Sequence, residues 1–228
     1  MSKIPSIEQM LKAGMHFGHR TSKWHPKMEP FIFTSRNGVY VIDLIKSRAM
    51  LETAIDYMVN FAKEGKVVLF VGTKPQVKGP MKAMAQEVGM PYITEKWMGG
   101  CLTNFNIIKK MIQKYNGLQK DKKAGKLDKY TKKERLEIDR DIEKLEMKVG
   151  GLTEMTKLPD AIFVWDIKKE KTAVQEAQKK NIPIIAICDT NVDPTGINYV
   201  IPSNDDATKT IKLVLNSIKE SILEAKKK

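Results

Sequence analysis

KVVLFVG, at residues 66–72, places five apolar residues in a row between a lysine and a glycine. A strand without polar alternation is typical of a parallel sheet, in which both faces of each strand are buried. Two similar runs follow later in the chain, DAIFVW at 160–165 and PIIAIC at 183–188. These three runs predict buried strands of one parallel sheet.

Helical segments with one apolar face alternate with these strands. The spacing of apolar residues predicts helices over residues 44–62, 74–88, 169–180 and 205–225. An alternation of strands and helices is typical of α/β layers joined by right-handed crossovers. The predicted fold is therefore α/β, with a doubly wound, mostly parallel sheet in a Rossmann-like or flavodoxin-like three-layer arrangement.

The first part of the chain shows a different pattern. Apolar residues at helical spacing predict a short helix that ends at Gly14. Farther on, two apolar runs at 31–33 and 39–42 flank the dipeptide Asn37-Gly38. Asn-Gly between such runs is a strong signal for a hairpin. We therefore predict two antiparallel strands here.

An interruption of the α/β pattern extends over residues 104–157. Its apolar residues are sparse and lie at helical spacing. Ile138, Ile142, Leu145 and Val149 follow one another by four, three and four residues, which is typical of a coiled-coil seam. The sequence predicts two helical arms that form an inserted antiparallel coiled-coil hairpin.

The hairpin divides the predicted domains. Residues 1–103 and 158–228 form a discontinuous α/β body, and 104–157 form the hairpin, with Gly125 between its two arms. The hairpin holds fifteen lysines and arginines against nine acids, which is nearly half of the surplus positive charge of the chain. The alternative is a solvated hairpin held by salt bridges, because its positive and negative residues are interleaved along the sequence. We favour an arm that reaches a partner.

The composition limits the classes of protein that need to be considered. The 228 residues are 42% hydrophobic, so the chain can form a core, and its formal net charge is +13. Such a charge favours nucleic acid as a partner, although a lysine-rich solubilising surface is the alternative. The chain has no run of eighteen apolar residues, so we expect no membrane span. Its first residues do not have the pattern of a signal peptide, so we expect none. Cys101 and Cys188 are far apart, so we expect no disulfide and a reducing cytosol.

Every histidine of the chain lies in one short basic segment that also contains a tryptophan. Its candidate RNA-contacting residues are His16, His19, Arg20, Lys23, Trp24, His25 and Lys27. Imidazole, indole and cationic groups can stack on bases or bind phosphates. Zinc is the alternative, but no carboxylate or thiolate stands at a suitable spacing nearby, so we predict no bound metal. Phe17 and Trp24 as core residues are a further alternative.

Gly72-Thr73-Lys74 follows a predicted strand and opens a helix, as phosphate-binding loops do. A phosphate-binding loop needs further glycines, and here Pro75 removes a backbone amide. We therefore predict no nucleotide hydrolysis. Lys74 and Lys78 are candidates for contacts with RNA phosphates, or else belong to a solvated helix start.

EKWMGGCLTN, at residues 95–104, is the least generic stretch of the chain. Its glycine pair permits positive φ and close approach of the backbone. Thr103 or Asn104 is predicted to cap the first helix of the hairpin. Cys101 has no base beside it in the sequence, so we do not expect a nucleophile.

Acidic residues follow the predicted strands in DTNVDP, at 189–194, and SNDDA, at 203–207. This edge of an α/β sheet is where ligands bind, and four carboxylates could hold Mg²⁺. Turn formation by Asp189 and Asp193, and helix capping by Asn204 or Asp205, explain the same residues. We favour the second interpretation.

Several of these stretches together resemble a known family. The matching motifs are HFGH at 16–19, WHPKM at 24–28, IDL at 42–44, FVGTK at 70–74, KWMGGCLTN at 96–104, LPD at 158–160, CDTNVDP at 188–194 and IPSNDDA at 201–207. The chain resembles the bacterial family of the second protein of the small ribosomal subunit. It departs from the family at three positions. The family usually has arginine at the position of Lys96 and glycine at that of Ser203, and it often has threonine or methionine at that of Cys101. Lysine keeps the charge at position 96 but loses the planar guanidinium.

The resemblance implies a structural constituent of the cytoplasmic ribosome and not an enzyme. Such proteins bind small-subunit RNA between head and body, lie near the messenger exit, and help to recruit ribosomal protein one. No cofactor, small-molecule substrate or membrane contact is implied. The predicted RNA-binding set is completed by Arg36, Lys96, Trp97, Asn104, Lys109 and Lys110.

Two other functions stay open from the residues alone. One is an α/β enzyme that uses a nucleotide or sugar phosphate at the sheet edge near Gly72 and Asp189. The other is an RNA-binding regulator that acts away from the ribosome.

Overall fold

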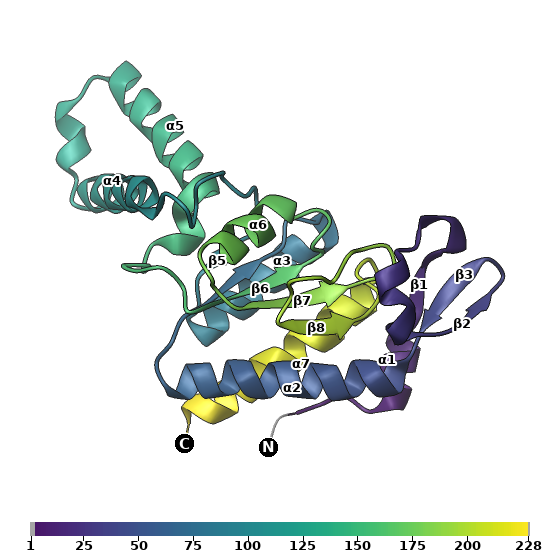
Figure 1. Ribbon diagram of the computed structural model, residues 1–228. Coiled ribbons are helices and arrows are strands. Elements are labelled where there is room, and N and C mark those ends of the chain that lie inside the picture. The colour runs from purple at the N-terminus through teal and green to yellow at the C-terminus, as the bar shows by residue number, and fades with distance from the viewer. Residues whose placement is uncertain (1–2, 228) are drawn as a thin grey trace.

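The main sheet of the computed structural model, which describes residues 3–227, has five strands in the order β5-β4-β6-β7-β8 (Figure 1). The strands are β4 (Val68–Val71), β5 (Tyr92–Ile93), β6 (Ala161–Trp165), β7 (Ile184–Cys188) and β8 (Tyr199–Pro202). Each neighbouring pair is parallel. Numbered within this sheet, the order is 2-1-3-4-5, the flavodoxin-like variant of the Rossmann-like doubly wound fold, with its switch point between β4 and β6. The predicted α/β class is confirmed.

Both faces of the sheet are covered. Helices α2 (Leu44–Lys63), α3 (Pro75–Val88) and α7 (Thr208–Lys226) pack on one face with Phe70 and Phe163. Helix α6 (Lys171–Lys179) and the segment 97–102 pack on the other with Leu69 and Val71. Successive side chains of a strand point to opposite faces, and here both faces meet an apolar layer. This explains why the strand sequences lack polar alternation.

The four predicted body helices are confirmed, with small differences at their ends. Helix α7 begins at Thr208, three residues after the predicted start, and its N-cap is Ala207, without a side-chain cap. The expected capping of this helix by Asn204 or Asp205 was therefore wrong, and Asn204 instead holds the turn before the helix. Its Oδ1 accepts hydrogen bonds from the backbone N–H of Asp206, at 2.9 Å, and of Ala207, at 2.7 Å. Within residues 3–227, no helix combines the length and the apolar character that crossing a bilayer requires.

A small antiparallel sheet precedes the main one. It has the order β1-β3-β2, from β1 (Phe17–Arg20), β2 (Ile32–Arg36) and β3 (Val39–Ile42). The predicted hairpin is confirmed, and Asn37 and Gly38 have φ of 51° and 74°, as a two-residue hairpin turn requires. The predicted N-terminal helix is α1 (Ile7–Ala13), and Gly14 ends it with φ of 79°. Short 3₁₀ segments, η1 (Thr21–Lys23) and η2 (Pro26–Phe31), connect β1 to β2.

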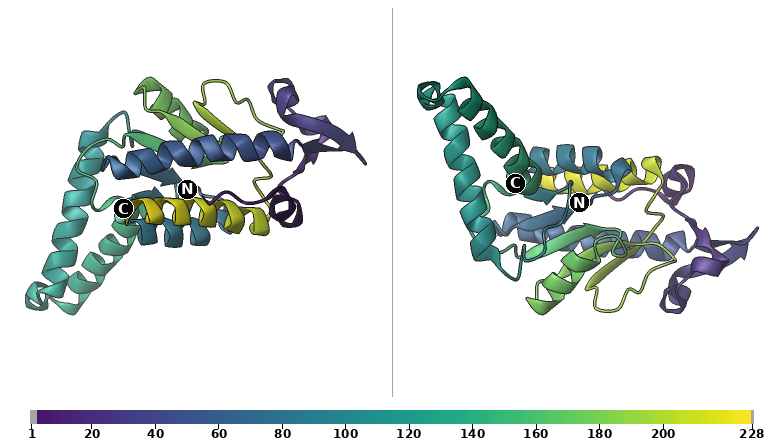
Figure 2. Two further views of the ribbon diagram at one scale, coloured as in Figure 1. Left: turned by 90° about the horizontal axis from the view of Figure 1, so that it is seen from below. Right: turned by 90° about the horizontal axis from the view of Figure 1, so that it is seen from above.

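Two helices project from the body at the end opposite to the small sheet (Figures 1 and 2). They are α4 (Phe105–Lys123) and α5 (Lys132–Val149), with η3 (Lys126–Lys129) between them and η4 (Gly150–Leu152) after them. We call α4, η3 and α5 the arm. Its buried residues, among them Ile108, Ile112 and Val149, belong to the same apolar cluster as the α6 face of the sheet. The coiled-coil repeat and the domain boundaries stay predictions.

Candidate nucleic-acid interface

Strand β1 carries the histidine-rich segment onto the loop that follows β7. The backbone N–H of His19 donates to Thr190 Oγ1 at 2.8 Å, and that of His25 donates to the carbonyl of Thr190 at 2.8 Å. A Cβ at Gly18 would lie 2.6 Å from Thr190 Cγ2, so only glycine allows this approach. The histidine-rich segment therefore lies beside acidic residues that are far away in the sequence.

Carboxylates gather at the edge of the sheet because parallel strands end on the same side. We call Asp166, Asp189, Asp205 and Asp206 the carboxylate cluster; they follow β6, β7 and β8. Lys74, which follows β4, places Nζ 2.9 Å from Asp166 Oδ2, 2.8 Å from Asp205 Oδ1 and 2.9 Å from Asp206 Oδ1. Only 12% of its side chain is exposed. One ammonium group thus bridges the loops after three strands.

These contacts change the protonation of the groups involved. Burial lowers the pKa of Lys74, but its hydrogen bonds to Asp205 and Asp206 raise it more, so the net shift is upward. Burial and the nearby charge of Asp189 raise the pKa of Asp205 to about 7, although Lys74 opposes this shift. Lys74 therefore stays charged at neutral pH, whereas Asp205 titrates there.

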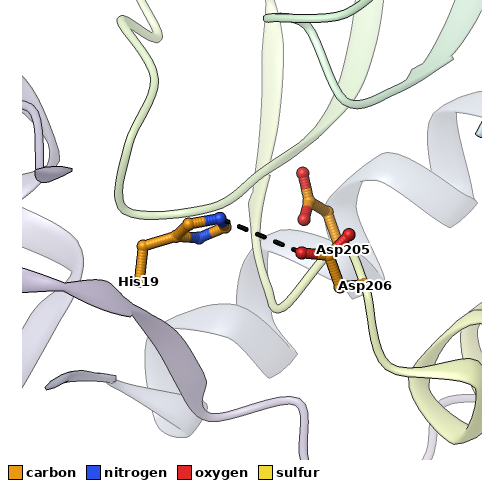
Figure 3. Close-up of side chains that lie close together, drawn as sticks. All are labelled: His19, Asp205 and Asp206. Atoms are coloured by element: carbon orange, nitrogen blue, oxygen red, sulfur yellow. Dashed lines mark ion pairs between the residues drawn. The ribbon is translucent and has the colours of Figure 1, made fainter.

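His19 adds a second cationic group to the carboxylate cluster. Its Nδ1 lies 3.0 Å from Asp189 Oδ1. Its Nε2 lies 3.9 Å from Asp206 Oδ2, the ion pair marked in Figure 3. The hydrogen bond to Asp189 raises the pKa of His19 more than burial lowers it. The imidazole therefore holds its proton more strongly than a free histidine does.

His19, Asp205 and Asp206 could also hold a metal ion. Each offers one ligand atom, and these atoms lie within 4.8 Å of one another (Figure 3). Imidazole and carboxylate are ligands that zinc accepts. No carboxylate stands at a suitable spacing near the histidines in the sequence, and it is the fold that brings Asp205 and Asp206, from the loop after β8, to His19. That no metal is bound stays a prediction, and Lys74 already supplies positive charge there.

Two other lysines of the predicted RNA-binding set have acidic partners. Lys27 Nζ lies 2.9 Å from Asp193 Oδ2 and donates to Thr195 Oγ1 at 2.7 Å. Lys78 Nζ lies 2.7 Å from Glu95 Oε2. Like Lys74, they are bound within the protein, and an RNA contact would compete with these carboxylates. Their contact with RNA stays a prediction.

The remaining basic candidates are exposed and form two groups. Arg20, Lys23 and Arg36 lie on and beside the small sheet, and Lys96, Lys109 and Lys110 lie at the base of the arm, near the exposed Asn104. Arg20 and Lys23 line a hollow of about 290 Å³ that also reaches His19 and Asp206. Their exposure makes these cations accessible to a phosphate backbone.

The aromatic and histidine candidates are less accessible. Trp24 is half-buried, with its ring centroid 5.0 Å from that of Tyr40. His16 is half-buried against Phe17, at 4.0 Å between ring centroids, and burial lowers its pKa. His25 is also half-buried, and its Nδ1 accepts from the backbone N–H of Lys27 at 3.3 Å. At least part of this segment therefore serves packing.

Glu176 is a central residue that the sequence analysis missed. Its Oε1 accepts from Trp97 Nε1 at 3.1 Å and from the N–H of Gly100 at 2.8 Å. Its Oε2 accepts from the N–H of Leu102 at 2.9 Å, and from both the N–H and the hydroxyl of Thr103 at 3.1 Å. Gly100 adopts φ of 88°, which lets these donors converge. The glycine pair in this stretch therefore serves an internal carboxylate.

The predicted cap of the first arm helix was wrong. Asn104 is the residue before α4, but its side chain makes no capping hydrogen bond. The Thr103 hydroxyl donates to Glu176 instead, because this carboxylate is the stronger acceptor. Trp97 is also buried, with 8% of its surface exposed, so its ring packs inside the protein.

Neither cysteine has the properties of a nucleophile. Burial, together with the nearby charge of Glu176, raises the pKa of Cys101 to about 12. Cys188 lies in β7, where burial also raises its pKa. Both thiols are therefore protonated at neutral pH, as expected for structural cysteines.

Comparisons with known proteins agree with the resemblance in the sequence. A family model described as Ribosomal protein S2 matches residues 10–225. The chain is 45% identical over 223 residues to the small ribosomal subunit protein uS2 of Coprothermobacter proteolyticus, covering 98% of this chain and 83% of that protein. It is 47% identical over 219 residues to the protein of the same name from Chloroherpeton thalassium, covering 96% and 88%.

These matches are to ribosomal proteins, which are structural and not catalytic. The chain belongs to the family of ribosomal protein S2, and it is not an enzyme.

Proposed function

We propose that the chain is a structural constituent of the small ribosomal subunit in the cytoplasm. The observation that carries this proposal is the family match over residues 10–225, together with two relatives that are both named small ribosomal subunit protein uS2. The net charge of +13 supports binding to the RNA of that subunit. From the family resemblance we place the protein between head and body of the subunit.

The exposed basic residues are the proposed phosphate contacts. They are Arg20, Lys23 and Arg36 near the small sheet, and Lys96, Lys109 and Lys110 at the base of the arm. Phosphate contacts fix the position of a protein on RNA, and each adds to the salt dependence of binding. Lys27, Lys74 and Lys78 mainly hold the protein itself together, since each has a carboxylate partner.

The arm is proposed to be a coiled-coil hairpin for attachment to the subunit. The segment 104–157, which contains the arm, carries fifteen basic residues against nine acids, and most of them are exposed. The family resemblance also implies a role in recruiting ribosomal protein one. Subunits depleted of this chain should then bind less ribosomal protein one, and adding the chain back should restore it. Equal binding with and without the chain would refute that role.

A triple variant tests the proposed contacts near the small sheet. Changing Arg20, Lys23 and Arg36 to alanine should reduce the slope of log affinity against log salt by about 2–3 units, at about 0.7–0.9 per phosphate contact. Binding to isolated small-subunit RNA is measured between 50 and 200 mM salt, a range in which about 6–10 contacts change affinity by about 10³–10⁵.

The matched control removes three lysines that are paired within the protein. Lys12, Lys66 and Lys219, which are outside the predicted RNA-binding set, lie 2.6, 2.6 and 3.1 Å from Glu8, Glu64 and Glu87. Changing them to alanine should alter the slope less than the first triple variant does. An equal reduction in both variants would show that net charge matters and not these positions, and no reduction in either would refute RNA binding at this surface.

A further inference from the structure

The loop 97–103 leads directly into the arm. Glu176, on α6 of the body, accepts five hydrogen bonds from this loop, at distances of 2.8–3.1 Å. Helix α4 begins at Phe105, only two residues after Thr103. Because the last hydrogen-bonded residue is so close to the helix, the direction of α4 follows from the position of this loop.

A second attachment holds the other end of the arm. A Cβ at Gly151 would collide with the carbonyl oxygen of Tyr92, so η4 packs directly on strand β5. Asn116 Nδ2 on α4 also donates to the carbonyl of Thr153 at 3.2 Å. The arm therefore meets the body at its entry through Glu176 and at its exit through Gly151.

The entry attachment is directional, whereas the apolar seam is not. Ile108, Ile112 and Val149 are buried with the body, but apolar contacts tolerate small rotations of a helix. Hydrogen bonds from backbone amides to a fixed carboxylate depend on distance and angle, so they do not tolerate such rotations. Removing the carboxylate would leave the Leu102 amide and the Trp97 indole N–H buried without this acceptor.

We infer that Glu176 is a positioning residue, which fixes the direction of the arm so that Lys109 and Lys110 align with RNA phosphates. This inference rests on the proposed function, namely RNA binding by the base of the arm. Both lysines are exposed and lie in the first two turns of α4. A change in the direction of α4 would displace them together.

The protonation of Glu176 agrees with this role. Burial raises its pKa, but hydrogen bonds from Thr103, Trp97 and Leu102 lower it more, so the net shift is downward. A lowered pKa in the folded protein means that the carboxylate contributes stability above its unfolded value of 4.5, and that this contribution is lost as pH falls through the folded pKa. At neutral pH the carboxylate is charged and the loop is held.

The test combines Glu176→Gln with Lys109→Ala and Lys110→Ala in a double-mutant cycle. Glutamine keeps the size of the side chain but turns an amide donor toward the donors of the loop. In the wild-type background the two lysine changes should weaken binding to small-subunit RNA by about tenfold. In the E176Q background the same changes should weaken it by less than about twofold, because the lysines are already misaligned.

The direction of the arm is measured separately. Spin labels on cysteines introduced at Gln113 and Lys179, both exposed, report the distance between arm and body, and the native cysteines are buried. E176Q should broaden this distance distribution. The control Glu154→Gln, which removes the same charge at an exposed position, should leave it unchanged.

The outcomes test the positioning role of Glu176 and RNA binding by the base of the arm separately. Independent effects of the lysines and Glu176 on affinity, or an unchanged distance distribution in E176Q, would overturn the positioning role. If the lysine changes do not weaken binding in the wild-type background, RNA binding by the arm base fails, while the distance measurement still tests Glu176. If E176Q does not fold, Thr103→Val removes a single hydroxyl donor, and an unchanged distribution there would also overturn the inference.

Discussion

Replacing Lys74 by methionine should lower the free energy of unfolding by about 3–5 kcal/mol, because it leaves buried carboxylates without their cation. The Asp205 side chain is 2% exposed and that of Asp166 is 10% exposed, so water cannot replace the ammonium group. Denaturant unfolding of the purified protein measures the loss. Lys82→Met, at an exposed position of α3, the helix that follows Lys74, is the control and should change stability by less than about 0.5 kcal/mol. An equally small change in Lys74→Met would contradict the bridging role.

The carboxylate cluster should also make stability depend on pH near neutrality. The pKa of Asp205 rises from 3.8 to about 7 on folding, so between these values the folded protein binds more protons than the unfolded chain. The free energy of unfolding therefore falls as pH rises through this window. The raised pKa of His19 acts in the same direction, because its contribution is present below 6.5 and is lost above the folded pKa.

Unfolding measured between pH 5 and pH 8 tests this dependence. Asp205→Asn cannot ionise but keeps an oxygen that accepts from Lys74, so it should flatten the curve. An equally steep curve in Asp205→Asn would show that the dependence comes from other groups.

Shortening the arm should strongly reduce incorporation into small subunits, by about tenfold or more if the removed residues make several contacts. The variant joins Tyr115 to Ile142 through a short Gly-Ser turn. The removed residues, 116–141, carry nine lysines and arginines against six acids. The buried base of the arm, including Ile108 and Val149, is retained, so the body should still unfold cooperatively. Incorporation is measured in competition with the wild-type chain.

A full-length variant tests the contribution of the charge of the arm separately from that of its length. Changing Lys120, Lys123 and Lys133, which are exposed near the tip, to glutamine keeps the helices and removes three charges. A partial loss of incorporation is expected there. Full incorporation of the shortened variant would contradict the attachment role, and loss of cooperative unfolding would show that the arm belongs to the core.

Local patterns predicted most of the secondary structure. Continuous apolar runs identified β4, β6 and β7, and the Asn37-Gly38 turn identified the hairpin. Strands β1 and β8 were missed because Gly18 and Pro202 lie within them. Such residues weaken the strand signal, and only pairing with neighbouring strands compensates.

The candidate site was less predictable because its contacts join distant segments. Lys74 and Asp205 had separate interpretations, as a phosphate contact and as a helix cap, and only the parallel order of the strands brings them within 2.8 Å. Glu176 gave no signal at all, since a glutamate in a basic helix is typical of a solvent-exposed position. The glycines of its binding loop were noticed, but their internal acceptor lies on another element.

Sedimentation of ribosomes from cells that express a tagged copy of this chain tests its proposed role most directly. After the subunits are separated at low magnesium, the tagged and untagged copies together should amount to about one per small subunit. The tagged protein should migrate with the small subunit and should be absent from the large subunit. Washing at moderate salt should leave it bound, since a ribosomal constituent has protein and RNA contacts together. Migration of most of the protein at the top of the gradient, free of subunits, would contradict a structural role in the ribosome.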